Sequence, residues 1–304
     1  MADAITFMRT VYGGTGSVRE AGTNLLPQHP AEDDEDYDRR LNRAVLYNAT
    51  KRTVSGMVGM MFRKEPQWET DPPPRTAEES LNIDMLGHDI GVYARDLATQ
   101  AVLDGHVWVL VDYPEVTSAP MSAAEERERG LRPYWVTIRA EDAINVQWDT
   151  VGGQPVLRLF AFRTTRTQPS GAFGEDTIEV VRVLRPGSCE DWVRTESGWE
   201  LEETKTVTLP FVPVAFVPAN EVAPFESEPP LLDLAYENID HYQIRSDHRH
   251  AAMFASTPMP VFFGMSPEDI DCGVNRAVFI GDPEASAQIL ESSGASLAST
   301  RQDL

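Results

Sequence analysis

A long run without helix breakers constrains this chain more than any other part of its sequence. Pro229 and Pro230 precede the run, Pro258 and Pro260 follow it, and roughly twenty-five residues with helical spacing lie between. The run predicts a helix over residues 231–255, about 35–40 Å long at 1.5 Å per residue. Such a helix is long for a globular protein.

Charged or titratable side chains occupy most faces of this predicted helix. In chain order they are Asp233, Glu237, Asp240, His241, Arg245, Asp247, His248, Arg249 and His250. A helix that is polar nearly all round either bridges solvent or packs against copies of itself. The pattern therefore favours an assembly over a ligand pocket.

The same histidines offer a metal site as an alternative. His241 and His248 lie seven residues apart on one helical face, where they could share a metal with Asp240. His248 and His250 point about 200° apart at 3.6 residues per turn, so both cannot join one site. A solvated or inter-subunit polar face is favoured, and no metal or cofactor is expected.

The net charge of -22 is the strongest signal in the composition. It argues against a clamp on DNA phosphates, which needs clustered lysine and arginine. Lysine occurs only at positions 51, 64 and 205. The acidic balance fits either the composition of the source or a surface past which nucleic acid can slide without sticking.

Several classes of protein lack their signatures in this sequence. No window approaches ~18 consecutive apolar residues, so no transmembrane helix and no membrane partner are expected. There is no G-x-S-x-G elbow and no H-E-x-x-H motif. Cys189 and Cys272 lie far apart and outside any zinc spacing, which is typical of buried or incidental thiols in a reduced compartment. We therefore expect that the chain is not an enzyme.

The first third of the chain predicts helices. Residues 1–38 are interpreted as an arm that contains several glycines and finishes in an acidic run. One helix is expected from about residue 36 to 62. Gly56 and Gly59 in that helix imply close contact with a neighbouring backbone. After a linker, Thr76 with Glu79 forms a possible capping box. It opens a helical region that breaks near Gly87 and ends at Leu103.

The rest of the chain predicts mostly strands, which gives an α+β class. Residues 106–114 form a continuous apolar run suited to a sheet buried on both faces. Residues 132–209 read as a β-meander, and a proline-laced extended segment at 209–219 leads out of it. Beyond the long helix, short strands are expected at 260–264 and 276–282, and a further helix begins at 296–304. Because the chain stops inside that last pattern, we expect a longer parent protein.

Four segments in this order resemble one family of proteins. They are LPQHPAEDDEDYDRRLNRAVLYNATKRTVSGMVGMMFRKEP, LDGHVWVLVDYP, RPYWVTIRAEDAINVQW and EPPLLDLAYENIDHYQIRSDHRHAAMFASTPMPVFFG. Together they resemble the portal (head-to-tail connector) proteins of tailed bacteriophages, in the podovirus-like branch. The resemblance covers most of residues 20–304.

The resemblance implies a ring, usually of twelve subunits, at one vertex of the capsid. The large terminase docks on such a ring during genome packaging, and tail adaptor proteins replace it before ejection. Major capsid and scaffold proteins are further implied partners. Double-stranded DNA passes through the channel without sequence-specific binding. The implied location is the virion, and the host cytoplasm during assembly.

The resemblance also implies a portal-like fold with an α/β wing, a long stem helix and a small β-containing clip. The implied divisions are an arm (1–38), the wing (39–220), a first stem helix (231–255), the clip (257–295) and the start of a second stem helix (296–304), with the crown absent. Candidate channel or inter-subunit residues are Asp233, Glu237, Asp240, His241, Arg245, Asp247 and Arg249. Candidate clip contacts between neighbouring subunits are Val261, Phe262, Phe263, Val278 and Phe279.

Two other functions stay open at this point. One is another head-tail connector or capsid-associated binding protein, although adaptors are usually too short to carry a β lobe of this size. The other is a metal-dependent hydrolase that uses Asp240, His241 and His248. The order of the segments favours the portal.

Overall fold

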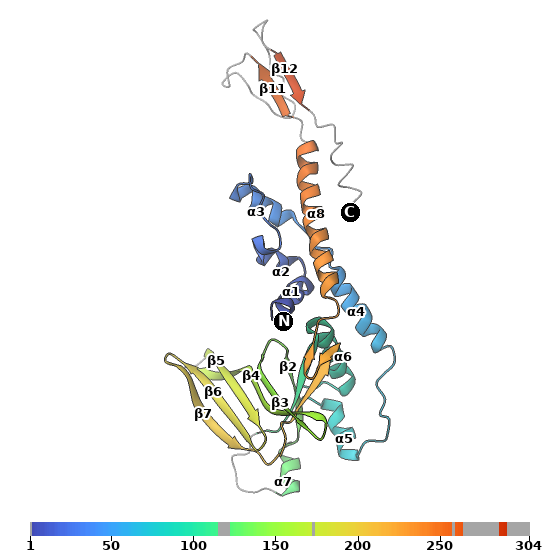
Figure 1. Cartoon of the computed structure of the whole chain (residues 1–304), viewed down its shortest axis with the longest axis vertical. Coiled ribbons are helices and arrows are strands. Elements are labelled where there is room, and N and C mark those ends of the chain that lie inside the picture. The colour runs from blue at the N-terminus through green and yellow to red at the C-terminus, as the bar shows by residue number, and fades with distance from the viewer. Residues whose placement is uncertain (1, 115–121, 172–173, 257–258, 264–285, 291–304) are drawn as a thin grey trace. The chain divides into compact units, whose positions relative to one another are not determined.

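Both helices and sheets build this protein, as Figure 1 shows. The computed structural model describes residues 2–114, 122–171, 174–256, 259–263 and 286–290. The chain divides into two compact units. The first is Met1–Tyr12 with Ala49–Ala235, and the second is Gly13–Asn48 with Tyr236–Leu304. The α+β class is confirmed.

The first unit holds the larger share of the elements. Its helices are α1 (Ala2–Gly13), α4 (Ala49–Met61), α5 (Pro74–Glu79), the 3-10 helix η2 (Ser80–Asn82), α6 (Ile90–Asp104) and α7 (Ala123–Glu128). Its strands are β1 (His106–Asp112), β2 (Tyr134–Arg139), β3 (Ala143–Val151), β4 (Gln154–Ser170), β5 (Gly174–Arg185), β6 (Ser188–Thr195), β7 (Gly198–Thr206), β8 (Val214–Pro218), β9 (Glu221–Ala223) and β10 (Glu226–Ser227).

The apolar run that follows α6 forms the middle of a three-stranded antiparallel sheet in the order β2-β1-β8. All residues from His106 to Leu110 are buried, so the prediction of a strand buried on both faces is confirmed for these residues, whereas Val111 is exposed. The proline-laced segment expected to leave the sheet instead supplies β8, whose Ala215 pairs with Val109. An edge strand tolerates prolines because one side of its backbone needs no partner in the sheet.

The predicted meander is confirmed from residue 143 onward. Strands β3 to β7 form a five-stranded antiparallel sheet in sequence order. The first segment assigned to the meander, β2, pairs with β1 instead. Sequence periodicity identifies a strand but does not select its partner, which depends on contacts between distant residues.

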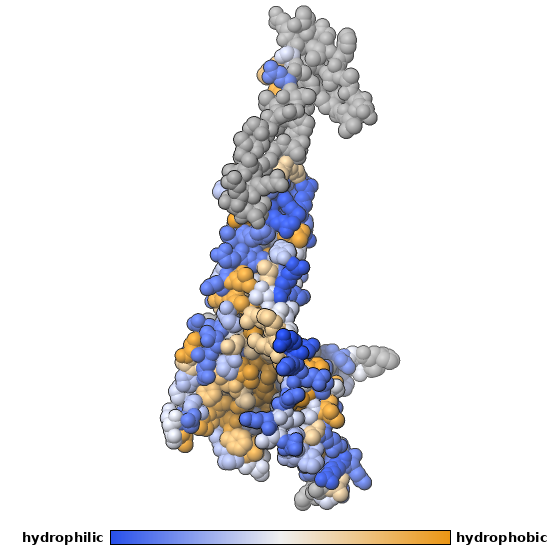
Figure 2. All heavy atoms as spheres, turned by 90° about the vertical axis from the view of Figure 1, so that its right-hand side faces the viewer, coloured by the Kyte–Doolittle hydropathy of each residue, from blue (hydrophilic) through white to orange (hydrophobic). Residues whose placement is uncertain are grey.

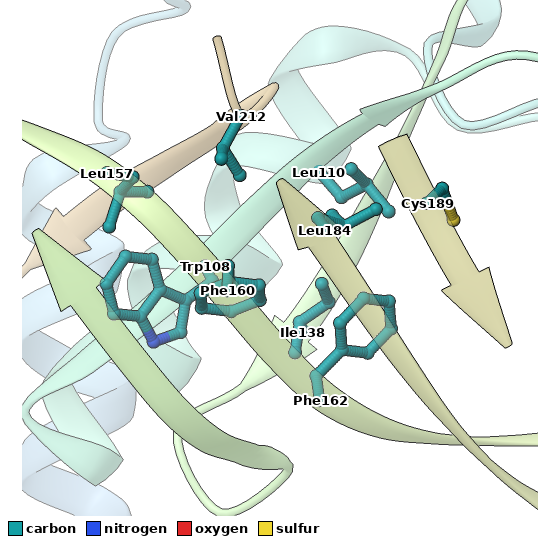
Figure 3. Packing of buried hydrophobic residues seen from close by; sticks show 9 residues of the cluster. All are labelled: Trp108, Leu110, Ile138, Leu157, Phe160, Phe162, Leu184, Cys189 and Val212. Carbon is teal, nitrogen blue, oxygen red and sulfur yellow. The ribbon is translucent and has the colours of Figure 1, made fainter. Parts of the chain in front are cut away.

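A hydrophobic core lies between these two sheets, and Figure 3 shows its members. Trp108 of β1 is central, with its ring centroid 4.8 Å from that of Phe160 and 4.7 Å from that of Phe216. The other buried members are Leu110, Ile138, Leu157, Phe162, Leu184, Cys189 and Val212. Burial raises the pKa of the Cys189 thiol to about 11, so this cysteine stays protonated and unreactive near neutral pH.

Helix α6 contacts β1 and β2. The Thr137 hydroxyl of β2 donates a hydrogen bond to the Tyr93 hydroxyl of α6 at 2.8 Å, and the Tyr93 ring lies edge-on to Trp135. Val102 of α6 also packs with Val54 and Val58 of α4 in a second, smaller cluster. Helix α6 thus packs against the face of the three-stranded sheet that lies away from the main core, and α4 packs against α6.

The predicted helix from 36 to 62 is wrong, because two helices occupy that stretch. Helix α3 (Asp34–Arg43) begins at the Asp33 cap, and its chain turns extended at Ala44. There the Arg19 guanidinium donates two hydrogen bonds to the Ala44 carbonyl, at 2.9 and 3.1 Å. A tertiary contact therefore satisfies a carbonyl that a continuous helix would have bonded internally.

Two local predictions near these helices also fail. Among the described residues, a Cβ placed on Gly56 or Gly59 would meet no atom within 4 Å, so the expected close backbone contact is absent there. The capping box at Thr76 does not form because α5 starts at Pro74, with proline in its first turn. Glu79 instead accepts a hydrogen bond from Arg75 at 2.8 Å. Proline at the first helical position needs no donor partner, which explains the earlier start.

The second unit contains the long helix. Its elements are α2 (Thr15–Glu20), the 3-10 helix η1 (Gly22–Asn24), α3, most of α8 (Leu232–Ser256), β11 (Met259–Phe263) and β12 (Ser286–Leu290). The predicted stem helix over 231–255 is thus confirmed as a helix. The residues read as an arm fold into α1, α2, η1 and the start of α3, where Met8 and Val18 are fully buried.

Gly105 joins α6 to β1 at a point of very close backbone approach. Its φ is 89°, and a Cβ there would lie 2.6 Å from the carbonyl carbon of Glu228. Its carbonyl also accepts a hydrogen bond from the Ala219 amide at 2.7 Å. A glycine is required here both for the backbone angle and for space.

We expect Gly105→Ala to lower the free energy of unfolding much more than Gly153→Ala. Gly153 has a similar φ of 82°, but a Cβ there meets nothing within 4 Å. The control should therefore cost about 1–2 kcal/mol from backbone strain alone, while Gly105→Ala adds a clash and should exceed ~3 kcal/mol in total. Urea unfolding measures both. Equal losses would show that the close approach to Glu228 is unimportant.

Candidate interface on the long helix

One stripe of α8 is buried, so the helix is not polar all round as the sequence suggested. The buried residues are Ala235, Asn238, Ile239, Tyr242 and Ser246. They recur three or four residues apart, which places them on one face. The sequence pattern did not predict this stripe, because Asn238 and Ser246 are polar and do not contribute to an apolar periodicity.

Polar side chains of α8 satisfy backbone carbonyls of the second unit. The Asn238 amide donates to the Tyr47 carbonyl at 2.8 Å, and the Gln243 amide donates to the Leu25 carbonyl at 2.9 Å. Both carbonyls belong to residues outside helices and strands. Since such carbonyls need partners when buried, α8 is held by hydrogen bonds as well as by apolar packing.

An acidic face lies opposite the buried stripe. Asp233, Glu237 and Asp240 are exposed, and at roughly 100° per residue they centre about half a turn from the stripe. None of the three has an ion-pair partner within the part of the chain that the structure describes. We call these three residues the acidic face of α8. Its three carboxylates are therefore available to contact solvent or a partner molecule.

Asp247, a candidate channel residue, takes part in an ion network inside the second unit. Its carboxylate lies 3.4 Å from Arg40 Nη1 and 3.3 Å from His29 Nε2. Arg40 in turn binds Glu32 at 2.7 Å and donates to the Pro27 carbonyl at 2.6 Å. The network ties α8 to residues 27–40.

The Arg40–Glu32 pair is the buried centre of this network. Their side chains are only 2% and 4% exposed. The hydrogen bond from Arg40 holds the pKa of Glu32 at about 2, well below its usual value. Neither residue was a sequence candidate. The acidic run that ends in Arg39 and Arg40 is the sequence feature that could have pointed to this ion pair. It does not show which of its charged side chains is buried.

The remaining candidates on α8 differ in their exposure. His241 and Arg245 are half-buried, whereas Arg249 is exposed and donates to the Arg43 carbonyl at 3.3 Å.

Across the described ranges, no three His, Cys, Asp or Glu side chains gather closely enough to hold a metal ion. No described helix is both long and apolar enough to cross a membrane.

Strand β11 pairs with β12 in antiparallel register, with Val261 opposite Gln288. Val261 is half-buried, Phe263 is exposed, and Phe262 lies opposite Ala287 on the ladder. The strand at 260–264 is thus confirmed, but its partner is a segment that was not predicted. The candidates Val278 and Phe279 lie outside the described residues, as does the helix expected at 296–304.

One family match covers the C-terminal part of the chain. Residues 230–304 match a family described as a domain of unknown function, DUF4055. The match begins next to α8 and includes the β11–β12 pair. No curated protein matches the chain.

We expect Glu32→Gln to lower the free energy of unfolding by about 3 kcal/mol. Removing one partner of a buried ion pair costs about 3–5 kcal/mol, and Asp247 remains near Arg40 to offset part of the loss. Glu35→Gln is the control, because the Glu35–Arg39 pair is exposed and such pairs contribute about 0–1 kcal/mol. Equal effects in the two variants would contradict a buried role for Glu32.

The same carboxyl should make stability depend on acid. The folded-state pKa of Glu32 is lowered from 4.5 to about 2, so its contribution is fully present above the unfolded value and is lost as pH falls through that window. Urea unfolding of the wild type at several pH values should therefore lose more stability between pH 4.5 and 2 than Glu32→Gln loses. Parallel pH profiles would show that another group carries the dependence.

Proposed function

We propose that this chain is a subunit of a bacteriophage portal ring, through which a genome is packaged and ejected. The observation that carries the proposal is α8. This helix runs from Leu232 to Ser256 and buries one stripe within its own chain. The acidic face opposite has no ion-pair partner among the described residues. A β-strand pair follows α8 in the sequence. These features support the assignment of α8 as a stem helix and of the strand pair as part of a clip.

The acidic face of α8 suits either of two positions in a ring. Turned towards a channel, its carboxylates would repel DNA phosphates and let the duplex move without tight binding. Turned towards a neighbour, they would meet cationic side chains such as Arg245 of the adjacent subunit. The net charge of -22 supports the conduit in both cases.

The β11–β12 pair supports contact between subunits. Two paired strands by themselves are marginally stable in water, and strand edges can pair with another chain. Exposed Phe263 on β11 offers apolar area for such a contact. In a ring, the neighbouring subunit would cover the edge and this side chain together.

The proposal also assigns partners and a location. A ring at the capsid vertex would bind the large terminase during packaging and tail adaptors afterwards, next to major capsid and scaffold proteins. These assignments rest on the resemblance of four sequence segments to portal proteins. Another head-tail connector is the alternative, and the subunit number of the ring would distinguish the two.

We expect the purified full chain to form rings at high concentration, and Phe263→Asp to reduce the ring fraction at least tenfold. The introduced carboxylate would lose its water in a clip contact, and this desolvation should lower the association constant of the subunits more than tenfold. Mass photometry and negative-stain electron microscopy measure the ring fraction.

Phe211→Asp is the matched control. Phe211 and Phe263 are each 51% exposed, but Phe211 belongs to the first unit. This variant should assemble like the wild type. A monodisperse monomer at all concentrations would contradict the ring, and equal loss in both variants would contradict the clip contact.

A further inference from the structure

A cavity of about 460 Å³ lies in the second unit between α3 and the C-terminal half of α8. Its lining includes Asp36, Arg39, Arg40, Arg43, Ser246 and Arg249. Four guanidinium groups around one cavity are unexpected in a chain that carries a net charge of -22. The cavity is also within the ~300–1,000 Å³ range of small-molecule sites.

Two of the four arginines are already neutralised. Arg39 binds Glu35 at 2.6 Å and Asp36 at 2.9 Å. Arg40 forms the buried pair with Glu32. The one carboxylate in the cavity lining, Asp36, is therefore engaged by Arg39.

The other two arginines have no carboxylate partner among the residues that the structure describes. Arg43 donates to the sulfur of Met253, which is a weak acceptor. Arg249 donates one of its five N–H groups to the Arg43 carbonyl. Two exposed guanidinium groups thus line the cavity, and most of their N–H donors have no acceptor in the described part of the chain.

Ser246 supplies an independent sign of a ligand. It lines the same cavity and is only 4% exposed, yet its Oγ has no hydrogen-bond partner in the described part of the chain. A buried hydroxyl without a partner costs about 1–3 kcal/mol. Such a group is normally satisfied, so an acceptor bound in the cavity would explain it.

From this geometry we propose that the cavity binds a small phosphate-bearing anion, either inorganic phosphate or a phosphate monoester. A phosphate carries about -1.5 to -2 charges near neutral pH, which matches two free guanidinium groups better than a single carboxylate does. The ligand is small because the acidic first turn of α3, with Asp34 and Glu35, would repel a polyanion. This site would exist whether or not the chain forms a ring.

Isothermal titration of the full chain with inorganic phosphate, at constant ionic strength set by chloride, tests the proposal. Saturable binding of one phosphate per chain is expected. Arg43→Gln should weaken it at least tenfold, since it removes a charge-assisted contact. Arg158→Gln is the matched control for net charge, because Arg158 is exposed on the five-stranded sheet, and it should leave the affinity within twofold.

Ser246→Ala separates a ligand site from a structural role. Without phosphate its Tm should equal or exceed that of the wild type, because the variant lacks a buried unpartnered hydroxyl. Its phosphate affinity should nevertheless fall severalfold. This variant also decides the matter if Arg43→Gln fails to fold.

Three results with phosphate, and one with DNA, would overturn the proposal. The first is absence of saturable binding in the wild type, and the second is equal weakening by Arg43→Gln and Arg158→Gln. The third is unchanged phosphate affinity in Ser246→Ala. A short DNA duplex should neither bind the cavity nor displace phosphate, and displacement that Arg43→Gln abolishes would show a polyanion site instead.

Discussion

The proline-free run forms one long helix, α8, and only one side of this helix is buried. The buried side is a stripe with small and polar members, among them Ala235, Asn238 and Ser246. Burying a stripe that is weakly apolar requires hydrogen bonds and an ion network in addition to packing. The Arg40–Glu32 pair, with Asp247 of α8, supplies that network. Everything else about the helix, including its free acidic face, follows from this orientation.

The acidic face and the arginine-lined cavity illustrate how one orientation separates charge. Asp233, Glu237 and Asp240 are exposed, and no cationic side chain pairs with them in the ranges that the structure describes. Arg43 and Arg249 line the cavity beside α3, and neither forms an ion pair with a carboxylate among the residues that the structure describes. Both side chains are exposed, so water can solvate their charges, and a bound anion would add charge-assisted hydrogen bonds to them. The two surfaces therefore suit different partners, one that avoids negative charge and one that carries it.

Sequence patterns predicted the elements of this fold better than their connections. The apolar run at β1, the strands from β3 to β6 and the long helix all carry periodicities that local physics can recognise. The break after Arg43 could not be foreseen, because Arg19 satisfies the Ala44 carbonyl from a distant position. For the same reason, Asp247 read as a channel residue although Arg40 engages it within the chain. Pairing across long sequence distances is not encoded in any local window.

Cryo-electron microscopy of the full chain at high concentration tests the central claim most directly. If the chain is a portal subunit, the particles are closed rings in which copies of α8 surround a central axis. The acidic face of each α8 then points to the channel or to the neighbouring subunit. Particles that stay monomeric, or an assembly in which α8 lies at the periphery with its acidic face in open solvent, would contradict the account.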